Sequence, residues 1–172
     1  MVLLSNPWYA VTLLGAPELW VMFAVLVFVI HIGMKVINRS KKDRKTKRRL
    51  HDLLFLLVPT IIITLLVVMA LKGLLDVPRQ CVPCLTELAG CNPYCPMDSS
   101  LPSGHSAIAA AGFTAIWLFG GRKKEWLWIY IIPILVMVSR IMLGVHTWLD
   151  VVAGAVLGIA IGFVVKEIDK KI

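Results

Sequence analysis

Two clusters of polar residues interrupt the apolar runs in the second half of this sequence. One is the Pro-Ser-Gly-His tetrapeptide at residues 102–105, and the other spans residues 139–150 and contains His146 and Asp150. On a helix, His146 and Asp150 would share one face because of their spacing. A carboxylate in that place accepts the Nδ1 proton of the imidazole and leaves the other ring nitrogen to act as a nucleophile or base. Ionisable groups within apolar segments are costly and mark candidate functional sites.

Three of the positively charged side chains have no explanation in membrane topology. The chain has 18 Lys and Arg residues, and the positive-inside rule assigns most of them to basic segments that face the cytoplasm. The exceptions are Lys72, Arg79 and Arg140, and all three fall on the expected outer side, beside the two polar clusters. Three cations and two histidines at one rim suit an anion of high charge, of which phosphate is the obvious example. The pattern therefore predicts a phosphate site.

A two-step phosphoryl transfer fits these residue types. Such a reaction depends on positioning and charge stabilisation more than on elaborate covalent chemistry. His146, oriented by Asp150, would attack phosphorus to form a phosphohistidine, and His105 would protonate the leaving oxygen and then activate water. The groups expected to bind the phosphate are Lys72, Arg79, Arg140, the hydroxyl of Ser103, and Gly104 at a helix start where free N–H groups favour anions. No metal and no cofactor is expected, since the three cations supply the positive charge.

The composition predicts that an all-α membrane protein carries these groups. Hydrophobic residues make up 59% of the chain and the mean hydropathy is +0.84, which exceeds what soluble domains show. We expect one domain over residues 1–172, folded as a bundle of five transmembrane helices with a catalytic core over residues 53–165. The predicted spans cover residues 19–37, 53–71, 105–120, 126–143 and 148–165. Residues 1–18, which are broken by prolines, are predicted to form an interfacial segment on the membrane surface, with a short extra span as the alternative.

The basic segment over residues 38–51 sets the predicted orientation. We interpret it as a cytoplasmic loop, which puts the N-terminus outside, the C-terminus in the cytoplasm, and the polar clusters at the extracellular or periplasmic face of the cell membrane. A lipid-headgroup site is the alternative for this segment. This topology explains the net charge of +8, so nucleic acid is not expected as a partner. Membrane lipids are the expected surroundings, and the sequence leaves the oligomeric state open.

All four cysteines lie in the predicted outer loop over residues 76–101. They are Cys81, Cys84, Cys91 and Cys95. Their spacings suit a tetrahedral zinc site, and they can equally form two disulfides with three alternative pairings. Disulfides are favoured because thiols tend to oxidise outside the cytoplasm. In either form the expected role is structural, since a staple would stiffen the loop that joins Arg79 to residues 102–105.

Three motifs in this chain resemble those of the type 2 phosphatidic acid phosphatase superfamily. Members of that family carry Lys-x6-Arg-Pro, then Pro-Ser-Gly-His, then Ser-Arg-x5-His-x3-Asp. Here the motifs occupy residues 72–79, 102–105 and 139–150, in the same order. The first motif departs from the pattern because Gln80 replaces the usual proline. The predicted number of spans also differs, since many integral members have six helices.

The resemblance implies an enzyme that hydrolyses an amphiphilic lipid phosphate without a metal, with His146 as the nucleophile and His105 as the general acid. Family substrates include phosphatidic acid, phosphatidylglycerophosphate and polyprenyl diphosphates. We favour hydrolysis of a polyprenyl diphosphate, such as undecaprenyl diphosphate, to the monophosphate, because the bundle is small and has little outer decoration. Phosphatidic acid and phosphatidylglycerophosphate are the alternative substrates.

Two hypotheses without enzymatic activity explain less of the sequence. An anion transporter would need ionisable residues at intermediate depths along a path, and the predicted spans hold almost none besides His31. A lipid-binding relative without activity would usually lack His105, His146 or Arg140, and all three are present. The phosphatase hypothesis accounts both for the scarcity of ionisable residues within the spans and for the presence of His105, His146 and Arg140.

Overall fold

The computed structural model describes residues 6–37, 41–81 and 92–169 of the chain. In these ranges the regular elements are helices, in agreement with the all-α prediction. They are α1 (Pro7–Thr12), the 3-10 turn η2 (Leu13–Gly15), α2 (Pro17–Ile37), α3 (Lys41–Leu75), α4 (Gly104–Phe119), the 3-10 helix η3 (Lys124–Tyr130), α5 (Ile131–Met142) and α6 (Trp148–Asp169).

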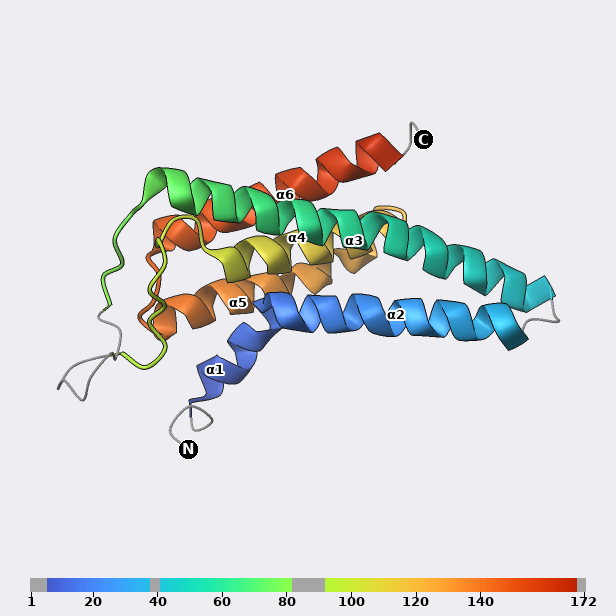
Figure 1. The fold of residues 1–172 in the computed structure, drawn as a ribbon, viewed down its shortest axis with the longest axis horizontal. Coiled ribbons are helices and arrows are strands. Elements are labelled where there is room, and N and C mark those ends of the chain that lie inside the picture. The colour runs from blue at the N-terminus through green and yellow to red at the C-terminus, as the bar shows by residue number, and fades with distance from the viewer. Residues whose placement is uncertain (1–5, 38–40, 82–91, 170–172) are drawn as a thin grey trace.

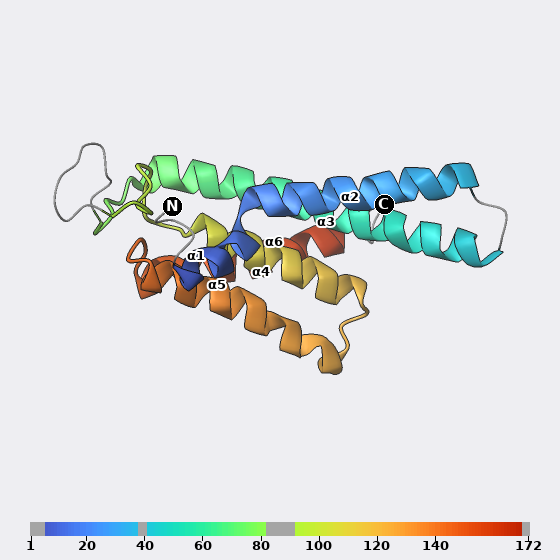
Figure 2. The ribbon, with the colours of Figure 1, turned by 90° about the horizontal axis from the view of Figure 1, so that it is seen from below.

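The helices form an elongated bundle in which α2 and α3 run side by side and α4 packs against α3, α5 and α6 (Figure 1). The end of α3, the start of α4, the end of α5 and the start of α6 lie together at one end of the bundle, as the second view also shows (Figure 2). The connection between α2 and α3 lies at the opposite end. Segments far apart in the sequence therefore meet at the first end, which we call the site end.

A stripe of small residues holds α6 against α4. A Cβ atom on Gly154 would lie 2.4 Å from the carbonyl oxygen of Ser103, and one on Gly158 would lie 2.1 Å from that of Ala107. Only glycine fits at these distances, so the two backbones touch, as small residues allow between helices in lipid. The backbone N–H of Ser103 also donates to the carbonyl oxygen of Asp150 at 3.0 Å. The start of α4 is thereby fixed relative to the start of α6.

Three helices in the described ranges are long and apolar enough to cross a membrane. They are Arg48–Leu75, Lys124–Met142 and Trp148–Asp169. The bent pair Pro7–Gly15 and Pro17–Gly33 adds a fourth if it is one broken span, and Gly104–Phe119 is a shorter apolar helix. These helices support a multi-pass membrane protein, while the count of five spans and their orientation stay predictions.

The prediction of a loop over residues 38–51 is wrong for most of that range, because α3 begins at Lys41 and runs for 35 residues to Leu75. Lysine and arginine are good helix formers, and the basic stretch contains no glycine or proline to end a helix. At about 1.5 Å per residue the helix is about 52 Å long, which exceeds a hydrocarbon core of ~30 Å. The basic turns of α3 therefore extend beyond its apolar part, at the end of the bundle away from the site end.

The described part of the predicted interfacial segment, residues 6–18, packs against the bundle. α1 contacts α5, and η2 contacts α4. Gly15 is buried, and a Cβ atom there would lie 2.6 Å from the carbonyl oxygen of His105. Pro17 explains the 55° bend between this segment and α2, because a proline disfavours helical geometry in the residue before it, and Ala16 is extended. The depth of the segment in a membrane stays a prediction.

A disulfide joins Cys81 to Cys95. It agrees with the preference for disulfides in this loop. It also contradicts the alternative in which all four cysteines bind one zinc ion, because two of the proposed ligands are bonded to each other. Cys84 and Cys91 lie outside the described residues. The bond fixes the chain that follows α3 to the chain that precedes α4.

Candidate active site

A cavity of about 500 Å³ at the site end brings together the residues that the sequence singles out. The three cations and both imidazoles line it, namely Lys72, Arg79, Arg140, His105 and His146. Five segments supply them: the last turn of α3, the chain that follows it, the start of α4, the end of α5, and the connection between α5 and α6. The predicted convergence of these groups is therefore observed.

His146 and Asp150 are adjacent, with Nδ1 of the imidazole 3.5 Å from Oδ2 of the carboxylate. That separation exceeds a normal hydrogen bond, and the buried Nδ1 has no other partner in the described chain. Asp150 is itself held by bonds of 2.6 Å from the hydroxyl of Ser100 and 2.8 Å from the backbone N–H of Thr147. Catalytic contacts often tighten only when substrate binds. Asp150 is therefore placed to orient His146 after a small shift of the ring.

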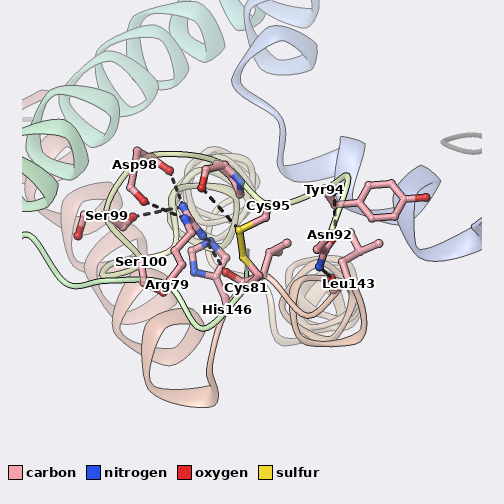
Figure 3. The surroundings of a disulfide bond; sticks show 12 residues. Arg79, Cys81, Asn92, Tyr94, Cys95, Asp98, Ser99, Ser100, Leu143 and His146 are labelled. Carbon is pink, nitrogen blue, oxygen red and sulfur yellow. Dashed lines mark hydrogen bonds and ion pairs between the residues drawn. A yellow bond between two sulfur atoms is a disulfide. The ribbon is translucent and has the colours of Figure 1, made fainter. Parts of the chain in front are cut away.

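The surroundings of His146 keep its imidazole neutral. Burial lowers its pKa from 6.5 to about 3, the positive charges of Arg79 and Arg140 act in the same direction, and Asp150 opposes them. Nε2, the ring nitrogen away from Asp150, lies 3.2 Å from Nη1 of Arg79 (Figure 3). A neutral ring has the free lone pair that a nucleophile needs. That lone pair faces a cation suited to hold a phosphate.

Arg140 is a buried guanidinium without a carboxylate partner among the described residues. It is 5% exposed, its Nη1 donates to Oγ1 of Thr12 at 3.1 Å, and its Nε has no acceptor. Burying a charge is costly unless the charge is paired and hydrogen-bonded. Because Arg140 lines the cavity, an anion bound there would supply the missing acceptors.

Lys72 and Arg79 share a carboxylate that the sequence analysis missed. Oδ2 of Asp98 accepts from Nζ of Lys72. Oδ1 of Asp98 accepts from Nη2 of Arg79 at 2.5 Å (Figure 3). Burial would raise the pKa of Asp98, but the hydrogen bonds from the two cations outweigh it and hold the pKa below its usual value. Asp98 is therefore ionised at neutral pH. It is the one acidic side chain among the residues that line the cavity.

The start of α4 brings His105 and Gly104 to the cavity but leaves the hydroxyl of Ser103 behind. His105 lines the cavity, and its ring makes no hydrogen bond to the rest of the described chain. A Cβ atom on Gly104 would lie 3.6 Å from its nearest neighbour, Val68, so alanine would fit in the empty site. Ser103 is fully buried and its hydroxyl accepts from that of Ser106 at 3.1 Å. The structure thus places the predicted phosphate-binding hydroxyl away from the cavity.

Three polar residues that support the site escaped the sequence analysis. The sequence offers a signal for Asp98, because a carboxylate in a loop with otherwise unexplained positive charge is a candidate partner of those cations. Ser100 also had one, since it lies next to residues 102–105. Thr12 had none, because it contacts Arg140 across 128 residues of sequence and looks like any threonine in an apolar segment.

The charge of the cavity comes from side chains. Three cations face one carboxylate, so an excess of positive charge remains when the histidines are neutral. Within the described ranges, no three His, Cys, Asp or Glu side chains are arranged to hold a metal ion. The arrangement suits recognition of a phosphoryl group by arginine and lysine, which match its oxygens.

Comparisons with known proteins agree with this geometry. The chain is 41% identical over 76 residues to an undecaprenyl-diphosphatase of Sulfolobus acidocaldarius, which covers 43% of this chain and 35% of that protein. It is 38% identical over 82 residues to phosphatidylglycerophosphatase B of Bacillus subtilis, which covers 42% of this chain and 40% of that protein. The matches thus span well under two thirds of the length of these relatives.

Two solved structures share the fold. The crystal structure of a transmembrane PAP2 type phosphatidylglycerolphosphate phosphatase from Bacillus subtilis matches with a TM-score of 0.65 and 27% identity, over 97% of this chain and 79% of that chain. That of Aquifex aeolicus LpxE matches with a TM-score of 0.51 and 25% identity, over 88% and 85% of the two chains. A family model described as the PAP2 superfamily matches residues 52–172, a range that contains all three motifs. The chain therefore belongs to the PAP2 superfamily.

Proposed function

We propose that this protein is a metal-independent phosphatase that hydrolyses a lipid phosphate or diphosphate through a phosphohistidine intermediate. The observation that carries the proposal is the convergence of three cations and two histidines on one cavity of about 500 Å³. The buried guanidinium of Arg140 adds to it, because it has no carboxylate partner among the described residues and an anionic ligand would supply one. The kind of reaction is also that of the named relatives.

In the first step, Nε2 of His146 attacks phosphorus while the bond from phosphorus to the leaving oxygen breaks. His105 in its protonated form donates a proton to that oxygen, so the alcohol or lipid monophosphate leaves with its leaving oxygen protonated. Asp150 stabilises the positive charge that develops on the imidazole, as a carboxylate beside Nδ1 does in related nucleophilic sites. Arg79 gives up its contact with Nε2, and the freed N–H of Nη1 then donates a hydrogen bond to a phosphoryl oxygen.

In the second step, water attacks the phosphohistidine. His105, now neutral, accepts a proton from the water, the bond between phosphorus and Nε2 breaks, and inorganic phosphate forms. Lys72, Arg79 and Arg140 stabilise the charge on the phosphoryl oxygens in both steps. Each histidine ends in its starting protonation state, so the cycle is complete without another reactant.

An amphiphilic substrate fits the walls of the cavity. Apolar side chains of α3 and α4 line one part of it, and the charged groups line the other. The apolar side chains include Leu65, Val68, Met69 and Ile108. We favour a polyprenyl diphosphate that is converted to the monophosphate, in line with the relative from Sulfolobus acidocaldarius. The Bacillus subtilis matches, one in sequence and one in structure, favour phosphatidylglycerophosphate as the alternative, with phosphatidic acid as a further glycerolipid candidate.

The site faces the outside of the cell in this proposal. The basic turns of α3 lie at the end of the bundle opposite the cavity. The positive-inside rule puts basic turns in the cytoplasm, so the cavity opens at the extracellular or periplasmic side of the cell membrane. The disulfide between Cys81 and Cys95 suits that side.

Phosphate release from lipid substrates tests the proposal. Purified protein in detergent with EDTA should hydrolyse a polyprenyl diphosphate, and His146→Ala and His105→Ala should each lower the rate by at least 10³-fold. His51→Ala is the matched control, because His51 lies on the exposed surface of α3 away from the cavity. Loss of activity with EDTA, or full activity in either catalytic variant, would overturn the mechanism. Phosphate release from none of the three lipid classes would favour an anion transporter or an inactive lipid-binding relative.

A further inference from the structure

Arg79 has no free donor in the empty site. Its Nε donates to the carbonyl oxygen of Asp98 at 2.9 Å. Nη1 donates to the carbonyl oxygen of Val145 at 2.7 Å and faces Nε2 of His146. Nη2 donates to Oδ1 of Asp98 and, at 3.2 Å, to the carbonyl oxygen of Ser99. A guanidinium has five N–H groups, so a phosphate oxygen can bind Arg79 only by replacing one of these acceptors.

Besides Nε2 of His146, which leaves Arg79 only when it attacks phosphorus, the acceptor that can leave most easily is the carboxylate of Asp98. Three of the five acceptors are backbone oxygens, those of Asp98 and Ser99 in the loop before α4 and that of Val145 between α5 and α6. Among the side chains, His146 is 2% exposed, whereas the side chain of Asp98 is 52% exposed. Rotation of Asp98 toward solvent would free Nη2 of Arg79 and Nζ of Lys72 together, because its two oxygens hold one cation each.

The backbone beneath Asp98 is held in place independently of its carboxylate. The disulfide between Cys81 and Cys95 joins the chain beside Arg79 to the chain beside Asp98 (Figure 3). The backbone N–H of Ser100 donates to the carbonyl oxygen of Val77 at 2.8 Å. The side chain of Asp98 can therefore move without the loop moving with it.

We propose that Asp98 is an internal competitor of the phosphoryl group, with its carboxylate occupying Lys72 and Arg79 in the empty site and giving way when phosphate binds. Between turnovers the carboxylate keeps both cations in position. After hydrolysis it competes with inorganic phosphate for the same donors, which speeds release of the product. The inference rests on the proposed function, since it names a residue that tunes phosphate affinity at the same site.

Removing the negative charge should therefore tighten the binding of phosphate. Asp98→Asn keeps the size of the side chain and deletes the charge that competes with the ligand. Two ion pairs are lost in which the carboxylate is half-exposed and the cations are mostly buried, and a pair that is partly open to solvent typically changes an affinity by about a few-fold. We expect the inhibition constant of inorganic phosphate to fall by about tenfold, with kcat lowered as product release slows. Asp76→Asn is the matched control: it deletes a carboxylate on the same rim that makes no side-chain contact with the cations, and asparagine tolerates its φ of 41°.

Two measurements decide the matter. The first is inhibition of lipid hydrolysis by inorganic phosphate, and the second is the rise in Tm of the purified protein on addition of inorganic phosphate, which needs no activity. Asp98→Asn should shift both curves to lower phosphate concentration, and Asp76→Asn should leave both unchanged. Weaker or unchanged phosphate binding in Asp98→Asn would show that Asp98 only positions the cations and is not displaced.

Asp98→Ala provides a second variant in case the asparagine disturbs the loop. If both variants fail to fold, Asp98 is a structural residue and the proposal is wrong. If wild-type protein hydrolyses no lipid phosphate, the proposed function fails, while the phosphate-dependent Tm still decides whether Asp98 competes with the anion. Absence of any phosphate effect on the wild-type Tm up to high millimolar concentration would also refute the competition.

Discussion

Replacement of Arg140 by methionine should make the empty protein more stable while it disables the site. The guanidinium is 5% exposed, and its bond to Thr12 is the one hydrogen bond it makes in the described chain. Exchanging a poorly compensated buried charge for an apolar side chain of similar length stabilises a fold by about 1–4 kcal/mol. Losing the bond to Thr12 costs about 1 kcal/mol. The net gain of roughly 0–3 kcal/mol corresponds to a Tm raised by up to ~10 °C.

The same replacement removes donors that we expect to hold the phosphoryl oxygens. A hydrogen bond to a charged group contributes about 1.5–3 kcal/mol, so loss of two lowers kcat/KM by about 10²- to 10⁴-fold. The assay pairs phosphate release with the Tm of phosphate-free protein in detergent, followed by tryptophan fluorescence. Thr12→Val is the control, because it deletes the one bond and keeps the charge, and it should lower the Tm slightly. A Tm for Arg140→Met clearly below that of wild type would refute the reasoning, since it would mean that the charge is already compensated in the empty site.

Two further predictions concern the bundle and its response to acid. Gly158→Ala should lower the free energy of unfolding by about 1–3 kcal/mol, as overpacking of a core does, because the new Cβ would lie 2.1 Å from a carbonyl oxygen of α4. Gly33→Ala is the control, since its Cβ meets nothing within 4 Å and should not destabilise the protein. Equal Tm values for the two variants would contradict the packing of α6 on α4. The pKa of His146 is lowered from 6.5 to about 3 in the folded protein. Between these two pH values the imidazole is protonated in the unfolded chain and neutral in the folded one. The free energy of unfolding should therefore fall by up to about 1.4 kcal/mol per pH unit as the pH drops below 6.5. Wild type should therefore lose more Tm than His146→Gln between pH 6.5 and 4, and parallel curves would rule out a neutral, buried His146.

The convergence of the three cations was predictable because the expected topology accounts for the other positive charges. Charges are costly at membrane depth, so few side chains compete for a functional interpretation, and Lys72, Arg79 and Arg140 stand out by elimination. The glycines of α6 indicate a close helix contact, whereas the identity of the partner, α4, comes from the structure. Glycines repeated at helical spacing, such as Gly154 and Gly158, have few uses besides close approach of two backbones.

Other features depend on information that a local pattern does not contain. Charge density predicts the side of the membrane on which a segment lies, but it does not determine backbone conformation, so the helical start of α3 at Lys41 was mistaken for a loop. The position of Ser103 beside His105 predicts a hydroxyl that binds phosphate, but the structure buries that hydroxyl against Ser106, and a local pattern does not determine which way a short side chain faces. The pairing of Asp98 with Lys72 and Arg79 joins residues 26 and 19 positions apart, so no local pattern predicts it.

The amino-terminal segment contributes to a site whose motifs all lie far downstream of it. Thr12 bonds to Arg140, Gly15 sits on the backbone of His105, and Pro17 lines the cavity itself. The region matched by the family begins only at residue 52. Exchanging this segment between two related chains would thus alter the pocket of the recipient without changing any motif residue. Differences in substrate preference within the family can therefore arise from a part of the chain that lies outside the motifs.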